Sequence, residues 1–294
     1  MTTIATIGFG EAAQAFVDGW RSEADASRIQ QLSTFDTKIE DPALRASIVE
    51  NAKRLSVRPC DQVHEAVYGA DAVFSLVTAD RALEAAEAAS NFLAANTVYL
   101  DCNSCSPATK RKSAAIVERT GASYVDVAVM APVYPARHRT PLLVSGPRAE
   151  EGASFLTQLG MKTRHVGTDV GRASSIKMLR SVMVKGIEAL TAECLLAARR
   201  AGVDTDVIAS LQASEPQVDW TGRGAYNLAR MMVHGKRRAA EMREVALTLK
   251  ELGLPCRMAA ATVDWQDEIG SLELEMQEAS FADRADLILE HYSD

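Results

Sequence analysis

Residues 2–13 read TTIATIGFGEAA, and this stretch decides the fold. The β-branched run 2–8 predicts a strand that ends in glycine, and the pattern of 11–24 changes to that of a helix. A strand, a tight glycine turn and a helix, in that order, form the basic repeat of a parallel α/β sheet. We therefore expect a sheet that is covered by helices on both faces.

The same alternation continues through the first half of the chain. Proline marks two expected helix starts, at Pro42 and Pro107, and an alanine-rich stretch between them predicts another helix. Strands that alternate with helices of this length predict parallel crossovers. Further strands are expected at 32–36, 71–77, 97–101, 122–129 and 141–146.

The second half of the chain has a different pattern, because strand signals largely vanish after about residue 170. Residues 174–202 predict one long helix that Gly202 ends. Gly253 and Pro255 are expected to end a later helix. The helices after the long one are expected at 204–213, 222–233, 236–252 and beyond 259.

Length and composition indicate a two-domain globular protein. A chain of 294 residues exceeds what one core usually organises, so we expect two domains, an α/β domain over 1–168 and an all-α domain, including the long helix, over 169–294. The fold class is therefore α/β, a doubly wound sheet followed by helices. The content of 47% hydrophobic and 24% charged residues is ordinary for a folded protein.

Charge and cysteine usage narrow the function classes. A formal net charge of −7 argues against a broad nucleic-acid or membrane-surface footprint, so small molecules are the expected partners. The N-terminus lacks the pattern of a secretory signal, and no apolar run reaches transmembrane length.

Five cysteines without disulfide-scaffold spacing favour a reducing cytoplasm. Cys102 and Cys105 lack the further ligands of a zinc set, so no metal site is expected.

The turn after the first strand matches a G-x-G-x-x-A version of the dinucleotide fingerprint. The first glycine permits the tight turn, the second lets the backbone approach a pyrophosphate, and the alanine allows close packing of helix on strand. The N–H groups at the helix start then face the phosphates. The expected cofactor contacts in this turn are Gly8, Phe9, Gly10, Glu11, Ala12 and Ala13.

Residues at the ends of later strands are expected to border the same cofactor. Asp36 ends the second predicted strand, where a carboxylate accepts hydrogen bonds from ribose hydroxyls and repels a 2′-phosphate, which favours NAD over NADP. Alternatively, Asp36 caps the following turn and the nearby Lys38 serves a phosphate, so NADP stays open. Val77 and Thr78 follow the third strand and Asn103 the fourth, at the edge where such sheets bind ligands.

The order of GFGEAA, LDCNSCSP, YVDVAVMAP and GRASSIKMLRS resembles the β-hydroxyacid dehydrogenase superfamily, which includes 3-hydroxyisobutyrate and 6-phosphogluconate dehydrogenases. The resemblance covers most of the chain. It implies a Rossmann domain, a long interdomain helix, an all-helical domain and a homodimer. It also implies a catalytic lysine on the long helix, several residues after a glycine, and the matching residues are Gly171 and Lys177.

The residues around Lys177 suit proton transfer. Oxidation of an alcohol by hydride transfer leaves a proton on oxygen, and a buried lysine with a lowered pKa can take it. Helical spacing places Ser181 and Glu188 on the face of Lys177, so we count them as catalytic candidates. A solvated network of lysine and glutamate is the alternative from spacing alone, and the family resemblance is what favours Lys177.

The substrate contacts are expected to depart from the family pattern. Asn103 and Ser104 match the element that holds substrate, although Ser104 or Ser106 can instead cap the next helix. Met130 begins Met-Ala-Pro where the family has Ser-Gly-Gly, so a standard carboxylate pocket is in doubt. Ser181 stands where an asparagine is expected.

The C-terminal half shows a third departure, because Ala240 precedes Glu241 where the family has a substrate lysine. We expect a substrate other than a plain 3-hydroxyisobutyrate-like acid. Arg180, His234 and Arg238 are candidates for binding an anionic group, and an exposed basic turn is the alternative.

These observations predict an NAD(P)-dependent dehydrogenase or reductase that acts on the CH–OH group of a hydroxy acid or on its carbonyl form. Two alternatives stay open. One is an imine reductase on the same scaffold, and the other is a dinucleotide-binding sensor without turnover.

Overall fold

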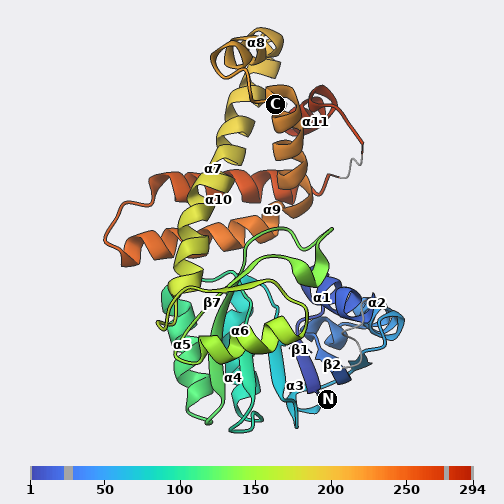
Figure 1. The fold of residues 1–294 in the computed structure, drawn as a ribbon. Coiled ribbons are helices and arrows are strands. Elements are labelled where there is room, and N and C mark those ends of the chain that lie inside the picture. Colours follow the sequence, from blue (N-terminus) through green and yellow to red (C-terminus); the bar gives the residue numbers. More distant parts are fainter. Residues whose placement is uncertain (1, 23–28, 275–277, 293–294) are drawn as a thin grey trace. The chain divides into compact units, whose positions relative to one another are not determined.

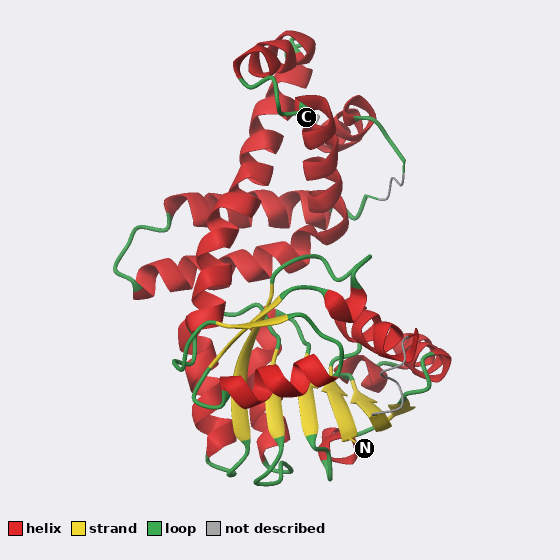
Figure 2. Cartoon of the chain, viewed as in Figure 1, coloured by secondary structure: helices red, strands yellow, loops and turns green. Residues whose placement is uncertain are grey.

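The computed structural model describes residues 2–22, 29–274 and 278–292. The chain divides into two compact units, Met1–Met178 and Leu179–Asp294. Helices and strands of the first unit are shown in Figures 1 and 2. Among the residues that are described, no helix combines the length and the apolar character needed to cross a membrane.

The first unit is built on an eight-stranded sheet with the order β3-β2-β1-β4-β5-β6-β7-β8. Neighbouring strands pair in parallel except β6 and β7, which are antiparallel. The chain adds strands on one side of β1 and then returns to add β4 on its other side, which creates a switch point between β1 and β4. The strands are β1 (Thr2–Ile7), β2 (Ile29–Phe35), β3 (Arg58–Pro59), β4 (Ala72–Ser75), β5 (Val98–Asp101), β6 (Ser123–Val129), β7 (Leu142–Ser145) and β8 (Thr163–His165).

Helices cover both faces of this sheet because the strands are apolar on both sides. In β4, Phe74 packs into the core beneath α1, where its ring lies 5.3 Å from that of Trp20, whereas Val73 belongs to the core on the other face. One face is covered by α1 (Glu11–Ser22), α2 (Pro42–Arg54) and α6 (Ala149–Gln158), and the other by α3 (Val63–Val67), α4 (Ala82–Ser90) and α5 (Pro107–Glu118).

The second unit is helical, and α7 (Arg172–Arg200) leads into it from the first. Its core joins side chains of α7, α9, α10 and α11, among them Leu195, Met231 and Ile269. The remaining helices are α8 (Asp204–Ser214), α9 (Trp220–Glu251), α10 (Arg257–Ser271) and α11 (Phe281–Leu289).

The α/β class, the parallel strands and the helical C-terminal half are confirmed. Gly202 and Gly253 follow the ends of α7 and α9 with positive φ, as expected for residues that end helices. The last two residues of the helix predicted at 11–24 lie outside the described residues.

The separation of 222–233 from 236–252 is wrong, because both belong to the single helix α9. Gly235 lies inside the continuous helix α9. Its missing side chain lets the backbone of α10 approach at Gly270. The short elements β3, α3, α6 and β8 were not predicted. β3, α3 and β8 have five residues or fewer, too few to show a period, and β3 and β8 form the edges of the sheet. In α6 the buried Ala149, Gly152 and Leu156 have helical spacing, so a signal was present there.

We predict that Gly235→Ala destabilises the helical unit. An added Cβ would lie 2.6 Å from the Gly270 Cα, so one helix must shift, which costs about 1–3 kcal/mol. Gly186→Ala is the matched control, because a Cβ there meets only the Thr262 hydroxyl at 3.9 Å and helix propensity gains up to about 1 kcal/mol. Thermal unfolding should therefore move to lower temperature for the first variant and not for the second.

Candidate active site

The turn between β1 and α1 can only be made by glycine at its first position. Gly8 has a φ of +88°, and a Cβ there would lie 2.5 Å from the carbonyl oxygen of Leu76. Gly10 is different, because a Cβ there would meet no atom within 4 Å. Open space therefore lies beside the first turn of α1, as close approach of a pyrophosphate to the backbone requires.

The other residues of this turn divide between core and surface. Phe9 and Ala13 are buried in the core beneath α1, so they contribute packing and backbone groups. Glu11 is exposed at the start of α1, and Ala12 is half-buried. The residues present thus fit a dinucleotide through backbone N–H groups, with small side chains where the helix meets the strand.

Asp36 follows β2 and ties two backbone segments together. One carboxylate oxygen accepts a hydrogen bond from the Phe9 N–H at 2.7 Å, and the other accepts from the Lys38 N–H at 2.9 Å. The second bond caps a short 3₁₀ helix (Thr37–Glu40), which confirms the capping role expected for Asp36. A carboxylate has about four acceptor positions, which leaves about two for ribose hydroxyls. Lys38 is exposed nearby.

Asn103 joins the ends of β4 and β5. Its Oδ1 accepts from the Val77 N–H at 2.7 Å, and its Nδ2 donates to Ser75 Oγ at 2.9 Å and to Asp101 Oδ1 at 2.8 Å. Both amide hydrogens are therefore engaged by neighbouring strands. Val77 and Thr78 lie at the same edge, directly after β4. The amide of Asn103 thus holds this edge in place.

A row of polar side chains crosses four adjacent strands below this edge. Backbone pairing sets Ser75 of β4 beside Asp101 of β5, Asp101 beside Asp126 of β6, and Asp126 beside Ser145 of β7. Two carboxylates thus occupy directly paired positions, which is unfavourable unless a cation lies between them.

Lys110 of α5 supplies that cation. Its Nζ lies 2.9 Å from Asp101 Oδ1 and 3.3 Å from Asp126 Oδ1, and it donates to the Asp101 carbonyl at 2.6 Å. All three side chains have 0% exposure. Lys110 was missed from sequence, although it lies in phase with the buried Ala114 and Val117 of its helix. A lysine on an apolar helix face was the available signal.

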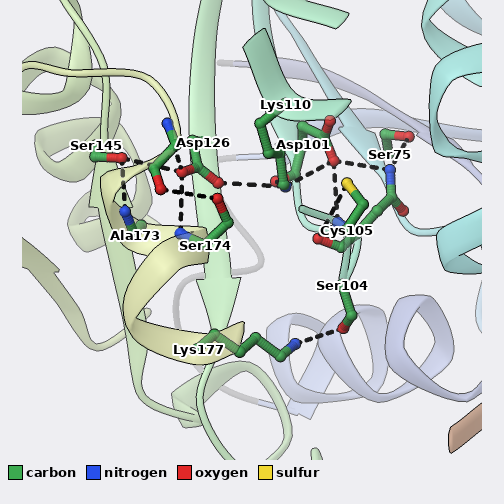
Figure 3. A network of polar contacts seen from close by, with 12 residues as sticks. Ser75, Asp101, Ser104, Cys105, Lys110, Asp126, Ser145, Ala173, Ser174 and Lys177 are labelled. Carbon is green, nitrogen blue, oxygen red and sulfur yellow. Dashed lines mark hydrogen bonds and ion pairs between the residues drawn. The ribbon is translucent and has the colours of Figure 1, made fainter. Parts of the chain in front are cut away.

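The other oxygen of Asp126 holds the start of α7. It accepts from the N–H groups of Gly171 and Ser174, each at 3.1 Å, and from Ser145 Oγ at 3.0 Å. N–H groups in the first turn of a helix have no partner within the helix, and a carboxylate at this end also favours the helix dipole. Figure 3 shows Asp126 between Lys110 and this turn.

One turn further along α7, Lys177 points toward the loop after β5 (Figure 3). Its Nζ donates to Ser104 Oγ at 2.5 Å, and both side chains are half-buried. Ser106 caps α5 by accepting from the Thr109 N–H at 3.2 Å. The structure therefore separates the two serines: Ser106 is the cap, and Ser104 contacts the lysine.

Burial controls the protonation of groups around this network. Burial raises the pKa of the Cys102 thiol to about 12, so it stays protonated at neutral pH. Burial likewise raises the pKa of Tyr124, whose hydroxyl donates to Asp101 Oδ2 at 2.6 Å, well above its ordinary value. Burial alone would lower the pKa of Lys110, but nearby negative charge, that of Asp101 foremost, raises it above its ordinary value.

The candidate residues of the helical unit form ion pairs of their own. Glu188 pairs with Arg238 and accepts from Gln266 Nε2 at 2.9 Å. Ser181 accepts from Lys185 Nζ at 3.3 Å, and that ammonium lies 2.8 Å from Glu241. The buried Glu188 and Arg238 thus neutralise each other.

Three further candidates differ in their exposure and position. Arg180 is exposed on α7, and His234 is half-buried on α9. Met130, in the first unit, donates its N–H to the Pro141 carbonyl at 2.9 Å. Within the described ranges, no group of three histidine, cysteine or acidic side chains is arranged to hold a metal ion.

The raised pKa values predict a loss of stability at alkaline pH. The ordinary pKa is 9.0 for Cys102, 10.0 for Tyr124 and 10.5 for Lys110, and each group keeps its proton to higher pH in the folded protein. Such groups contribute stability below the unfolded pKa, and this is lost as pH rises. We expect the free energy of unfolding to fall from about pH 9, by about 1.4 kcal/mol per pH unit for each group involved.

Urea unfolding across this range measures the effect. Cys102→Ala removes the first of the three groups to titrate, so its stability should fall less steeply than that of the wild type between about pH 9 and pH 10. Cys194→Ala removes an exposed thiol and should follow the wild-type curve. Equal slopes for Cys102→Ala and the wild type would contradict the prediction.

Comparison with known proteins supports a family assignment. Residues 31–167 match the NAD binding domain of 6-phosphogluconate dehydrogenase, and residues 198–269 match a domain of unknown function, DUF1932. A conserved hypothetical protein from Sinorhizobium meliloti is 37% identical, with 99% of this chain and 96% of that chain covered and a TM-score of 0.72.

Two further structures are similar to the chain, one in sequence and fold and one in fold alone. Conserved protein MTH1747, whose structure reveals similarity with 3-hydroxyacid dehydrogenases, is 31% identical over 92% of this chain and 98% of its own, with a TM-score of 0.66. The 3-hydroxyisobutyrate dehydrogenase of Mycobacterium tuberculosis shares the fold, with 15% identity, coverage of 98% and 99%, and a TM-score of 0.73. The chain therefore belongs to the β-hydroxyacid dehydrogenase superfamily, whose members are oxidoreductases that use a nicotinamide dinucleotide.

Proposed function

We propose that this oxidoreductase transfers a hydride between a nicotinamide dinucleotide and the CH–OH carbon of a hydroxy acid or its carbonyl form, with Lys177 as general acid and base. The contact between Lys177 Nζ and Ser104 Oγ carries the proposal. It lies in the loop that follows β5, beside the strand ends where an open α/β sheet binds its ligand. An amine in hydrogen-bond reach of a hydroxyl at this edge is suited to proton transfer.

Lys177 and Ser104 have separate tasks in the proposed reaction. When bound, the nicotinamide supplies the acceptor or donor of the hydride. In the oxidation, the neutral amine of Lys177 takes the proton of the substrate hydroxyl; in the reduction, its ammonium returns that proton to the new alcohol oxygen. Because Lys177 donates to Ser104, the hydroxyl hydrogen of Ser104 is left to donate to the substrate oxygen.

The groups that bind this substrate differ from those that bind a small, plain hydroxy acid in the family pattern. The Met130 N–H is engaged by Pro141, and Pro132 has no N–H, so this segment offers fewer backbone donors for a carboxylate. We assign recognition of an anionic group to Arg180 and His234, with Ser181 as a polar contact. Arg238 and Glu188 serve as a buried pair that supports α7 and α9. Because this segment offers fewer donors for a carboxylate, an imine, which carries no carboxylate, is a second class of substrate to test.

We assign dinucleotide binding to residues 1–168, and substrate binding and dimerisation to residues 169–294. Large apolar side chains exposed on the helical unit support a homodimer, among them Met183 at 64% and Val233 at 63% exposure. The protein would act in the cytoplasm, where thiols such as Cys102 stay reduced.

Lys177→Met tests the proposed function. Loss of the proton carrier should lower kcat by about 10²–10⁴-fold while dinucleotide binding stays intact. The assay follows the absorbance of reduced nicotinamide with a panel of hydroxy acids, aldehydes, alcohols and cyclic imines.

Lys112→Met, an exposed lysine on α5, is the matched control and should keep wild-type turnover. Binding of the dinucleotide without turnover on the whole panel, or turnover that is indifferent to Lys177→Met, would count against the dehydrogenase.

Asp36 supports a preference for NAD over NADP, and Asp36→Asn tests it. The variant removes the charge that repels a 2′-phosphate and weakens the acceptor for ribose hydroxyls, so the ratio of the two Kd values should move toward NADP by about tenfold or more. Calorimetric titration with each dinucleotide measures the ratio. Asp41→Asn, at a carboxylate that caps α2, is the control and should leave the ratio unchanged. An unchanged ratio in Asp36→Asn would remove the basis for the preference.

A further inference from the structure

Lys110 of α5 lies between Asp101 and Asp126, and the proposed reaction does not use it. It has no exposure to solvent, so it cannot contact a substrate directly. Its two carboxylate partners nevertheless serve the two sides of the contact between Lys177 and Ser104. Asp101 begins the loop that carries Ser104, and Asp126 holds the first turn of the helix that carries Lys177.

The hydrogen bonds show how each carboxylate acts. Asp101 Oδ1 accepts from the backbone N–H of Asn103 at 3.0 Å and from its side-chain amide at 2.8 Å, which fixes the residue before Ser104. Asp126 Oδ2 accepts from the N–H groups of Gly171 and Ser174, and Ser174 precedes Lys177 by three residues, or nearly one turn. Both carboxylates give their Oδ1 to Lys110.

A purely structural role explains this arrangement poorly. Burial of charged groups costs several kcal/mol for each ion, and well-packed apolar residues in the same place are often neutral or stabilising. An ammonium between two carboxylates does what apolar residues cannot. It makes directional hydrogen bonds to the carbonyl and the carboxylate of Asp101, it forms an ion pair with Asp126, and the three groups keep a net charge of about −1.

Hydrogen bonds bring that charge near the reacting lysine. Asp126 accepts from the N–H of Ser174, three residues before Lys177, and Lys177 contacts Ser104, three residues after Asp101. The charges of Lys110, Asp101, Lys177 and Asp126 all contribute to the pKa of the Cys102 thiol. The titratable or charged groups around this cluster are Tyr99 and Asp101 of β5, Cys102 and Cys105 of the following loop, Tyr124 and Asp126 of β6, Lys110 and Arg111 of α5, and Lys177 of α7.

We propose that Lys110 is a positioning residue for Lys177: its ammonium bridges Asp101 and Asp126, holds Ser104 and the first turn of α7 in register, and sets the charge that Lys177 faces. The inference rests on the proposed function, because it gives Lys177 its task. The quantity that it predicts is the titration midpoint of the Lys177 amine, which is measurable without a substrate.

Two substitutions change the buried charge in opposite directions. Lys110→Met leaves two carboxylates without their cation, so Lys177 faces more negative charge and its pKa should rise by about one unit. Asp126→Asn removes one negative charge, so the pKa of Lys177 should fall by about one unit. Loosened structure alone would move Lys177 toward the same value in both variants. Opposite shifts therefore distinguish the proposal from a structural effect.

The test is competitive acetylation of the full chain with acetic anhydride over a pH series, with the extent of reaction at Lys177 read by peptide mass spectrometry. Lys112→Met is the matched control on the same helix and should reproduce the wild-type midpoint. Lys110→Arg retains the cation and should restore the midpoint lost in Lys110→Met. Thermal unfolding confirms that each variant is folded. If Lys110→Met is not, Lys110→Gln, which also removes the cation, takes its place beside Asp126→Asn.

Opposite shifts of the Lys177 midpoint, with recovery in Lys110→Arg, are the expected result. Unchanged midpoints, or shifts of one sign in both variants, overturn the proposal. The proposed function is judged separately, by the dependence of turnover on Lys177→Met. The role of Lys110 can thus fail while the dehydrogenase stands, and it can hold even if no panel substrate is turned over.

Discussion

Asp101 and Asp126 occupy directly paired positions on the neighbouring strands β5 and β6, where their negative charges repel each other. The ammonium of Lys110, on α5, compensates this repulsion, and all three side chains are shielded from water. The remaining carboxylate oxygens then accept from Tyr124 on one side and from the first turn of α7 on the other. Strand pairing, helix packing and the start of the long helix all depend on this one compensated charge cluster.

The topology explains why the cluster lies so close to the chemistry. Strand order reverses between β1 and β4, and the dinucleotide-binding turn opens at that point, with Gly10 beside free space. Asn103 then links the end of β4 to β5. A short path of hydrogen bonds and one ion pair, that of Lys110 with Asp126, therefore runs from the cofactor edge through Asp101 and Lys110 to Asp126 and α7.

Local signals predicted much of this from the sequence. The glycine turn, the proline helix starts and Gly202 are features of single segments, and they placed the strands of the sheet, the turn before α1 and the long helix α7. The choice of Lys177 on that helix came from the family resemblance. Tertiary contacts were not accessible in this way. Gly235 resembles a helix break, yet the approach of α10 makes it part of a continuous helix. Lys110 and Asp126 pair across two separate elements, and only the folded structure brings them within 3.3 Å of each other.

The compensated cluster also constrains how such a chain can diverge. Removing one partner of a buried pair typically costs about 3–5 kcal/mol, whereas exchanging all partners for well-packed apolar residues is often close to neutral. Lys110, Asp101 and Asp126 therefore form an epistatic unit: single replacements at any of the three positions are selected against, while joint replacement is tolerated by the fold. Among relatives, the three positions should be inherited together or lost together, and a lineage that has lost them must hold its long helix by other means.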